Sequence, residues 1–256
     1  DMNWPDDLGN KEKDAVRDMI ENMVKVEAGT FYMGAQKDSV EYYCYDEEAT
    51  SLEGPVHKVS VSEFYINKYE VTQLLWEAIM GETPNKEKDM QWEDEFGKGD
   101  NYPAYRISYN EVETFIGKLN EYTGLRFSLP TEAQWEYAAR GGKNTYYELY
   151  AGGYNVLEVA WIDSNSDKCS EVGKKNANGL GLYDMSGNVW EMCQDWYYDY
   201  TEEAVTDPVG EEYNQGYKVF RGGSWNTNAQ QARVTARYRQ GIHYRDYNTG
   251  FRLVIE

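Results

Sequence analysis

Residues 126–142 read RFSLPTEAQWEYAARGG, and this stretch separates a helical first half of the chain from an irregular second half. Thr131 and Gln134 have the spacing of a capping box, in which each side chain binds the other residue's backbone N–H. The glycines at 141 and 142 are typical of a helix end. The stretch therefore predicts a helix that begins after Thr131 and ends before the glycine pair.

Two further helices are predicted before this stretch. Thr72 can cap the segment QLLWEAIM, and a glycine follows that segment directly. Ser108 and Glu111 form a second capping box, after which apolar residues recur at helical spacing until Gly124. We therefore predict one helix over residues 73–80 and another between Ser108 and Gly124.

The remaining regular structure is predicted as short strands. Residues 23–36 and 57–71 alternate apolar and polar side chains, as strands with one buried face do, and we interpret them as two antiparallel strands. Between them, residues 38–53 form an acidic, tyrosine-rich loop that is too polar for the core, and we assign it no role. Short strand-like runs also occur at 217–225 and 250–256.

A few helices, scattered strands and much irregular chain indicate an α+β fold in one domain. Residues 1–22 are highly charged and carry only a short helical pattern, so we interpret them as a leader segment. The domain proper is then expected to span residues 23–256.

Composition excludes two classes of partner. The chain has a formal charge of −20 and a pI near 4.5, whereas nucleic-acid binding needs clustered Lys and Arg, so we exclude nucleic acid. No apolar run approaches the roughly 20 residues that cross a bilayer, so we do not expect the chain to span a membrane.

The three cysteines are Cys44, Cys169 and Cys193. Their number is odd and their spacing wide, which fits neither a zinc cluster nor a disulfide framework. Whether any two of them form a disulfide stays open at this point.

Six segments together carry a resemblance to a known family. In chain order they are VEAGTFYMG, PVHKVSVSEFYINKYEVT, RFSLPTEAQWEYAARGG, GLGLYDMSGNVWEMCQDW, FRGGSW and GFRLV. With these motifs the chain resembles the formylglycine-generating enzyme, or sulfatase-modifying factor, family. The resemblance implies that family's variation of the C-type-lectin fold, with small twisted antiparallel sheets, a few helices and much irregular chain.

The resemblance also points to a copper site, and the sequence departs from it. Family members that make formylglycine hold copper with two cysteines, one shortly after GGS and one five residues further on. The matching residues here are Thr227 and Ala232, which cannot replace the soft thiolates that Cu(I) prefers. We therefore expect no copper cofactor and lean against an oxidase. Similarly, His57 and His243 are too few for the histidine-rich iron site of related sulfoxide-forming enzymes.

A calcium site is better supported. In LYDMSGNVWE, Asp184 and Glu191 offer carboxylates, while Gly187 and Val189 can supply backbone carbonyls, and such hard oxygen donors suit Ca²⁺. Asp184 stands where the family commonly has asparagine. In the alternative interpretation, both carboxylates only accept hydrogen bonds from backbone N–H groups of the turn.

The C-terminal segment offers a candidate binding surface. It combines rigid aromatic side chains with adaptable polar ones, a mixture suited to recognition, although it could also be a merely solvated loop. Some proteins of this fold are ligand-binding receptors whose corresponding segment is diversified. The candidate binding residues are Trp225, Asn226, Thr227, Asn228, Gln230, Tyr238, Arg239, His243, Tyr244, Arg245 and Tyr247. Among them we expect Trp225, Tyr238 and Tyr244 to be the anchors.

Together these features favour a non-oxidising binding module that recognises a protein, peptide or glycan. The alternative is a formylglycine-generating oxidase, or a related enzyme, that acts on a protein substrate; a structural role in a surface assembly is a third possibility. The acidity and the calcium-compatible turn lead us to expect an exported protein, which would be periplasmic, on the cell surface or lipid-anchored.

Overall fold

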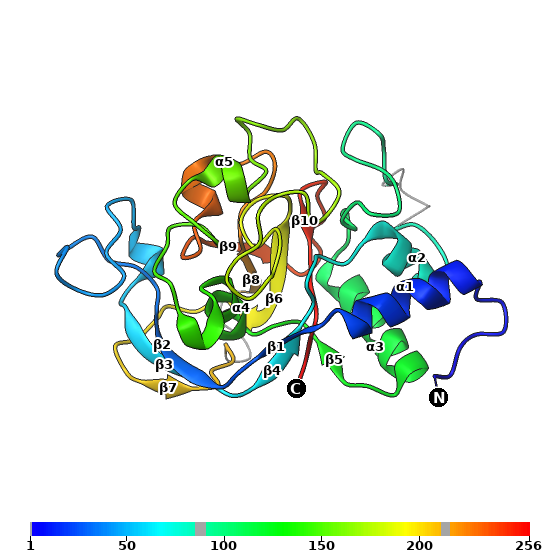
Figure 1. Cartoon of the computed structure of the whole chain (residues 1–256), viewed down its shortest axis with the longest axis horizontal. Helices are drawn as coiled ribbons and strands as arrows, with labels where there is room; N and C mark the ends of the chain where they lie inside the picture. Colours follow the sequence, from blue (N-terminus) through cyan, green and yellow to red (C-terminus); the bar gives the residue numbers. More distant parts are fainter. Residues whose placement is uncertain (1, 85–90, 211–215) are drawn as a thin grey trace.

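The computed structural model of the chain describes residues 2–84, 91–210 and 216–256. Small sheets lie in the middle of the molecule, α1, α2 and α3 pack together at one end, and the loop that contains residues 38–53 projects at the opposite end (Figure 1). Much of the chain between these elements is irregular. The predicted α+β class and the sulfatase-modifying-factor variation of the C-type-lectin fold are confirmed.

Helices α2, α3 and α4 form where the sequence predicts them, whereas the four-residue helix α5 was not predicted. Thr72 caps α2 by accepting a hydrogen bond from the N–H of Leu75 at 3.3 Å, and capping boxes begin α3 and α4. Gly81 and Gly124 end α2 and α3 in the left-handed conformation that glycine adopts without strain. The helices of the described residues are α1 (Asn10–Glu21), α2 (Gln73–Met80), α3 (Tyr109–Thr123), α4 (Glu132–Ala139) and α5 (Val156–Val159).

The strands form three small sheets with the orders β1-β4-β11-β5, β10-β6-β8-β9 and β2-β3-β7. The predicted antiparallel pair is present as β2 and β3, although two-residue β7 and β10 join their sheets in parallel. The strands are β1 (Val24–Val26), β2 (Gly29–Met33), β3 (His57–Val61), β4 (Phe64–Ile66), β5 (Phe127–Ser128), β6 (Trp190–Trp196), β7 (Val205–Thr206), β8 (Tyr217–Arg221), β9 (Arg237–Gly241), β10 (Thr249–Gly250) and β11 (Val254–Ile255).

Two large apolar cores and one smaller cluster around Ala232 hold these elements together. One lies around α2 and α3, where Trp76 stacks on Phe115 with ring centroids 5.3 Å apart and Phe251 meets both rings edge-on. The other lies between the β2–β3 pair and α4, and includes the fully buried Trp135. Both cores draw residues from the beginning and the end of the chain, so the fold closes only when its C-terminal strands are in place.

The segment predicted as a leader contains helix α1, which packs against α2. Val16 on this helix has no exposed surface. The helix therefore forms part of the packed molecule.

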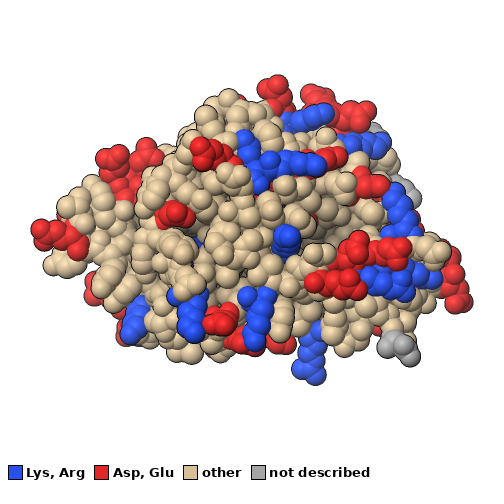
Figure 2. All heavy atoms as spheres, in the orientation of Figure 1, with Lys and Arg blue, Asp and Glu red and all other residues tan. Residues whose placement is uncertain are grey.

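Charge is unevenly distributed over the surface. At the end formed by the loop with residues 38–53, the face shown in Figure 2 carries carboxylates, whereas acidic and basic side chains alternate over the helical end. Every helix in the described ranges is too short or too polar to cross a bilayer.

Candidate functional site

Helix α4 lies at the centre of the candidate site, and all eight of its residues are buried. Its two glutamates face arginines of β8 and β9. Arg221 donates to Glu132 at 2.7 Å and to Glu136 at 2.6 Å, and Arg237 donates to both oxygens of Glu132 at 2.7 and 2.8 Å. The helix therefore fixes the end of β8 and the beginning of β9.

These ion pairs stay charged although they are buried. Burial alone would raise the pKa of Glu132, but Arg237 and Arg221 hold that pKa below its usual value. The pKa of Glu136 is also lowered against the effect of burial, by Arg140 and Arg221. Each buried carboxylate is therefore matched by guanidinium groups, which offset the cost of burying its charge.

After β8 the chain makes a tight turn at Gly222 and Gly223, both with positive φ. A Cβ on Gly223 would lie 2.8 Å from the carbonyl oxygen of Gln231 and 2.9 Å from the Cα of Ala232. Only glycine fits at this position without displacing the segment that carries Ala232. The turn therefore packs directly against Ala232, which stands where the second copper-binding cysteine is expected from the family resemblance.

The hydroxyl of Thr227 is used inside this turn. It accepts a hydrogen bond from the N–H of Ser224 and donates one to the carbonyl of Ser224, both at 2.9 Å. Ala232 ends the short helical turn Ala229–Ala232, is fully buried, and packs with Tyr150 and Ile162. The Thr227 hydroxyl is thus hydrogen-bonded to backbone groups, and the Ala232 side chain has no atom that can bind a metal.

A group of contacting aromatic and amide side chains lies beside this turn. Tyr238, which is 38% exposed, stacks on Trp190 with ring centroids 5.1 Å apart. The backbone N–H of Trp190 donates a hydrogen bond to the backbone carbonyl of Asn248. The amide of Asn248 donates to the side chain of the exposed Asn226 at 2.9 Å. Next to these residues, Trp225 and Tyr247 lie with ring centroids 5.7 Å apart. We call this surface, formed by Trp190, Trp225, Asn226, Tyr238, Tyr247 and Asn248, the aromatic strip.

The members of the strip differ in accessibility. Trp225 is only 8% exposed, because it packs against Tyr247 and Phe96. Tyr247 in turn stacks on Phe96 with ring centroids 4.4 Å apart. Trp225 and Trp190 therefore form the floor of the strip, and Tyr238 and Asn226 offer the accessible side chains.

The other predicted binding residues lie around the strip. Arg239 lies on the opposite face of β9 from Tyr238, with its guanidinium over the rings of Tyr197 and Tyr217. The hydroxyl of Tyr244 donates to Asp246 at 2.6 Å.

Four further predicted residues are dispersed. His243 is exposed, and Arg245 pairs with Glu111 of α3 at 2.9 Å. Asn228 caps the turn Ala229–Ala232, and Gln230 reaches the carbonyl of Glu48 at 3.4 Å. The acidic loop therefore borders the C-terminal segment, a proximity that the sequence pattern did not indicate.

The predicted calcium turn is built around Gly187. Its φ is +77°, and a Cβ there would lie 2.3 Å from the carbonyl oxygen of Trp161. Glu191, four residues further along on β6, is fully buried. Both of its carboxylate oxygens accept hydrogen bonds from Arg252, and one of them also accepts the indole N–H of Trp135. Asp184 accepts the N–H of Gly173 with one oxygen at 2.7 Å.

The other oxygen of Asp184 is the feature that fits a cation. This oxygen, Oδ1, is buried and has no hydrogen-bond partner among the described residues. Burial raises the pKa of Asp184 to about 6, and the charge of Glu191 contributes to the rise. In the described ranges, however, no three His, Cys, Asp or Glu side chains are grouped to hold a metal. A cation here would therefore depend on the backbone carbonyls of the turn as well as on carboxylates.

Glu70 belongs to the same buried region, and sequence reasoning missed it. Its carboxylate accepts the side-chain amide of Asn188 at 2.7 Å and the N–H of Val189 at 3.3 Å. Burial, followed by the charges of Asp184 and Glu191, raises its pKa well above the usual range. The signal available in the sequence was a lone acid inside the strand-like run INKYEVT.

The three cysteines are free thiols, and all are buried. Burial raises the pKa of Cys44 to about 12 and also raises the pKa values of Cys169 and Cys193. The open question of a disulfide is therefore answered, since no two of these residues are paired.

Comparisons with known proteins agree with the family resemblance that the motifs indicate. The family model described as "Sulfatase-modifying factor enzyme 1-like domain" matches residues 9–256. The chain is 30% identical to the chaperone protein LppX of Paenibacillus barcinonensis, over 69% of this chain and 74% of that protein. It is 27% identical to the formylglycine-generating enzyme of Thermomonospora curvata, over 94% of this chain and 95% of that enzyme.

Other relatives are longer than this chain. The serine/threonine-protein kinase pkn1 of Chlamydia pneumoniae is 30% identical over 94% of this chain, which spans 39% of the kinase's length. Among solved structures, Treponema denticola variable protein 1 superposes with a TM-score of 0.76 at 28% identity, over 91% of this chain and 94% of that one.

Proposed function

This chain belongs to the sulfatase-modifying factor family, and from that premise we propose that it is a non-oxidising binding module. Its ligand is a protein, peptide or glycan, and the aromatic strip is the surface that recognises it. The two positions that carry copper-binding cysteines in oxidising members hold Thr227 and Ala232.

The observation that carries this proposal is the state of those two positions. The Thr227 hydroxyl is hydrogen-bonded to the backbone N–H and carbonyl of Ser224, and Ala232 is buried against Gly223. Neither residue offers the thiolate that Cu(I) requires, and the three cysteines of the chain are buried elsewhere as neutral thiols.

The strip supports recognition in place of oxidation. Tyr238 presents a rigid aromatic face over Trp190, and Asn226 adds an exposed amide beside it. Aromatic rings with neighbouring amides bury much area with few rotatable bonds and still allow adaptable hydrogen bonding.

We propose in addition that one Ca²⁺ binds at the 184–191 turn. The ligands would be Asp184, whose Oδ1 is unpartnered, the carbonyls of Gly187 and Val189, and Glu191, which would have to give up a hydrogen bond from Arg252 to bind the cation. Bound there, the cation would supply charge compensation for buried carboxylates and stabilise the turn beneath the strip. We also propose that the chain is exported, since a calcium-stabilised acidic domain suits a compartment outside the cytoplasm.

The test is a binding screen with the full chain against arrays of glycans and of peptides. A ligand found in either array should bind Tyr238→Ala at least tenfold more weakly than wild type. Tyr65→Ala is the matched control, because Tyr65 has a similar exposure of 41% but lies on β4 in a different sheet. Equal loss in both variants, or no loss in Tyr238→Ala, would remove the strip from the proposal.

A further inference from the structure

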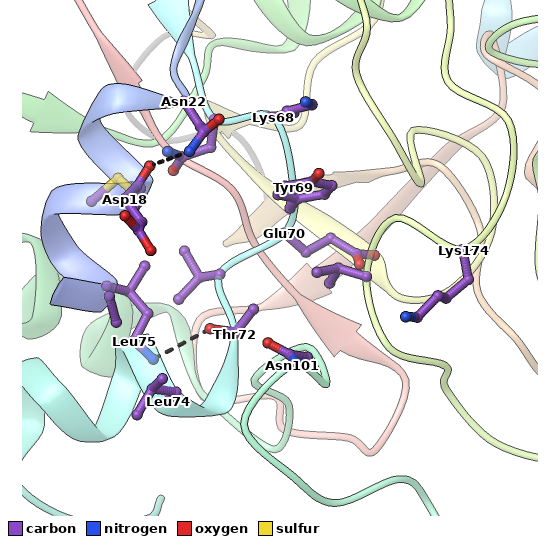
Figure 3. A pocket seen from close by; sticks show the side chains of 15 residues that line it. Asp18, Asn22, Lys68, Tyr69, Glu70, Thr72, Leu74, Leu75, Asn101 and Lys174 are labelled. Atoms are coloured by element: carbon purple, nitrogen blue, oxygen red, sulfur yellow. Dashed lines mark hydrogen bonds between the residues drawn. The ribbon is translucent and has the colours of Figure 1, made fainter. Parts of the chain in front are cut away.

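A second cavity lies away from the aromatic strip, between α1 and the chain segment that leads into α2. It has a volume of about 420 Å³, and the side chains that line it are shown in Figure 3. Asp18 and Asn22 face it from α1, Lys68 and Tyr69 lie across from them, and Lys174 lies on a third side (Figure 3). This volume falls within the usual range of pockets for small molecules, roughly 300–1,000 Å³.

One wall of the cavity carries a polar group without a partner. Asn67 lines the cavity, is only 3% exposed, and accepts the N–H of Leu253 with its side-chain oxygen. Its Nδ2 amide nitrogen is buried and has no hydrogen-bond partner in the described part of the chain. A buried donor left unpaired costs about 1–3 kcal/mol, so a ligand that brings an acceptor to this nitrogen would gain that energy.

The charge beside Asn67 indicates the kind of acceptor. Lys68 lies over the rings of Tyr69 and Tyr183, at 5.6 and 5.7 Å, and forms no ion pair with any described residue. Asn67 and Lys68 line the same cavity, and a carboxylate can accept hydrogen bonds from both an amide N–H and an ammonium. The acceptor end of the ligand is therefore assigned as a carboxylate.

The opposite wall supplies a negative charge and apolar surface. Asp18 projects from α1 toward the cavity, and its carboxylate forms no ion pair with a described residue (Figure 3). Met19, Val71 and Leu75 add apolar side chains to the lining. A ligand that matches Asn67, Lys68, Asp18 and this apolar surface carries a carboxylate, an ammonium group and a short apolar side chain.

We propose that this cavity binds a free α-amino acid with an apolar side chain. Its carboxylate lies at Asn67 and Lys68, its ammonium faces Asp18, and its side chain packs on Met19 and Leu75. The cavity is distinct from the aromatic strip, so this proposal does not depend on the proposed function.

The test is calorimetric titration of the full chain with three small molecules. L-leucine should bind with a dissociation constant below about 1 mM. Both 4-methylpentanoate, which lacks the ammonium, and leucinamide, which lacks the carboxylate, should bind at least tenfold more weakly. Binding of 4-methylpentanoate equal to that of leucine would overturn the role of Asp18, and no binding of leucine would overturn the site.

Isosteric variants locate the binding. Asn67→Asp keeps the oxygen that accepts from Leu253 but loses the free N–H donor, and Asp18→Asn removes the charge from α1; each should weaken leucine binding at least tenfold. Asp14→Asn, on the same helix but outside the cavity, is the control and should bind as wild type does. Circular dichroism confirms that each variant is folded, and equal affinity in Asp18→Asn and Asp14→Asn would contradict the proposal.

Discussion

The ring of Tyr238 rests on the ring of Trp190, with centroids 5.1 Å apart and planes inclined by 25°. The upper ring is partly open to solvent and the lower ring is 3% exposed. A partner that covers Tyr238 would thus meet a side chain already held in place, with little conformational entropy left to lose.

We predict that Tyr238→Ala weakens ligand binding at least tenfold, which is about 1.4 kcal/mol, with little change in melting temperature. The ring is partly exposed, so its loss removes contact area without opening the core. Surface plasmon resonance and thermal melting measure the two effects. A large fall in melting temperature together with unchanged binding would assign Tyr238 to the scaffold.

Trp225 provides the contrast. It was expected to be an anchor like Tyr238, but at 8% exposure its truncation should lower the free energy of unfolding by about 3–5 kcal/mol, as for a core tryptophan. Loss of binding in Trp225→Ala would therefore not by itself identify a contact with the ligand.

We predict that the purified chain binds no stoichiometric copper and forms no formylglycine. Thr227 and Ala232 supply no thiolate, and the buried cysteines have raised pKa values. Mass spectrometry of a cysteine-containing peptide, incubated with the protein, Cu(I) and oxygen, is the measurement. An aldehyde-bearing peptide above the level in a protein-free control would establish the oxidase alternative.

Calcium should stabilise the fold. A cation at Asp184 and the turn around Gly187 would add about 2.7 kcal/mol to the free energy of unfolding at a hundredfold excess over its dissociation constant. Calcium should therefore raise the melting temperature of wild type and have less effect on Asp184→Ala. If chelator and calcium leave the wild-type melting temperature unchanged, hydrogen bonds alone close the turn.

The buried ion pairs should be far more sensitive than surface pairs. Arg221→Met removes a guanidinium from two buried glutamates and should lower the free energy of unfolding by about 3–5 kcal/mol. Lys25→Met breaks the exposed pair with Glu63 and should cost at most about 1 kcal/mol. Urea unfolding of both variants gives the comparison, and similar costs would mean that the buried network contributes no more than a surface contact.

Asp195 should give the stability a distinct pH dependence. Burial, reinforced by the charge of Glu132, raises its pKa from 3.8 to about 7. Between pH 3.8 and about 7 the folded state keeps the Asp195 proton, whereas the unfolded state releases it. The contribution of Asp195 to the free energy of unfolding is therefore fully present below pH 3.8 and is lost as the pH rises to about 7. At 1.36 kcal/mol per pKa unit, the loss is roughly 4 kcal/mol.

The comparison with Asp195→Asn isolates that contribution. As pH rises from about 4 to 8, the free energy of unfolding of wild type should fall relative to that of this variant. A difference that is flat with pH would show that the Asp195 carboxyl titrates normally in the folded state.

Local rules predicted the helices well because their capping residues act over three or four positions. Thr72, Ser108 and Thr131 begin α2, α3 and α4 as their spacing indicates. The family motifs then supplied the fold, which propensity alone could not, because β5, β7, β10 and β11 are two residues long. Strands of that length carry no periodic signal.

The interior of the site was less predictable. The sequence of α4 indicates a helix but not that Glu132 and Glu136 point inward, since Arg221 and Arg237, which bind them, lie 85 or more residues away. Burial of Trp225 and the position of Glu70 beside Asn188 likewise follow from tertiary packing. Long-range contacts of this kind leave no mark in a local pattern.

The separation between Glu132 and Arg237 has a consequence for how the chain is made. Their two positions are 105 residues apart, and ribosomes add about 5–20 residues each second, so α4 is complete roughly 5–20 s before its last guanidinium exists. During that interval the nascent helix carries two carboxylates that no arginine of β8 or β9 can yet neutralise, and its aromatic residues have no finished core to enter. Folding of this domain during biosynthesis therefore waits for its final strands, and premature termination leaves the central helix uncovered.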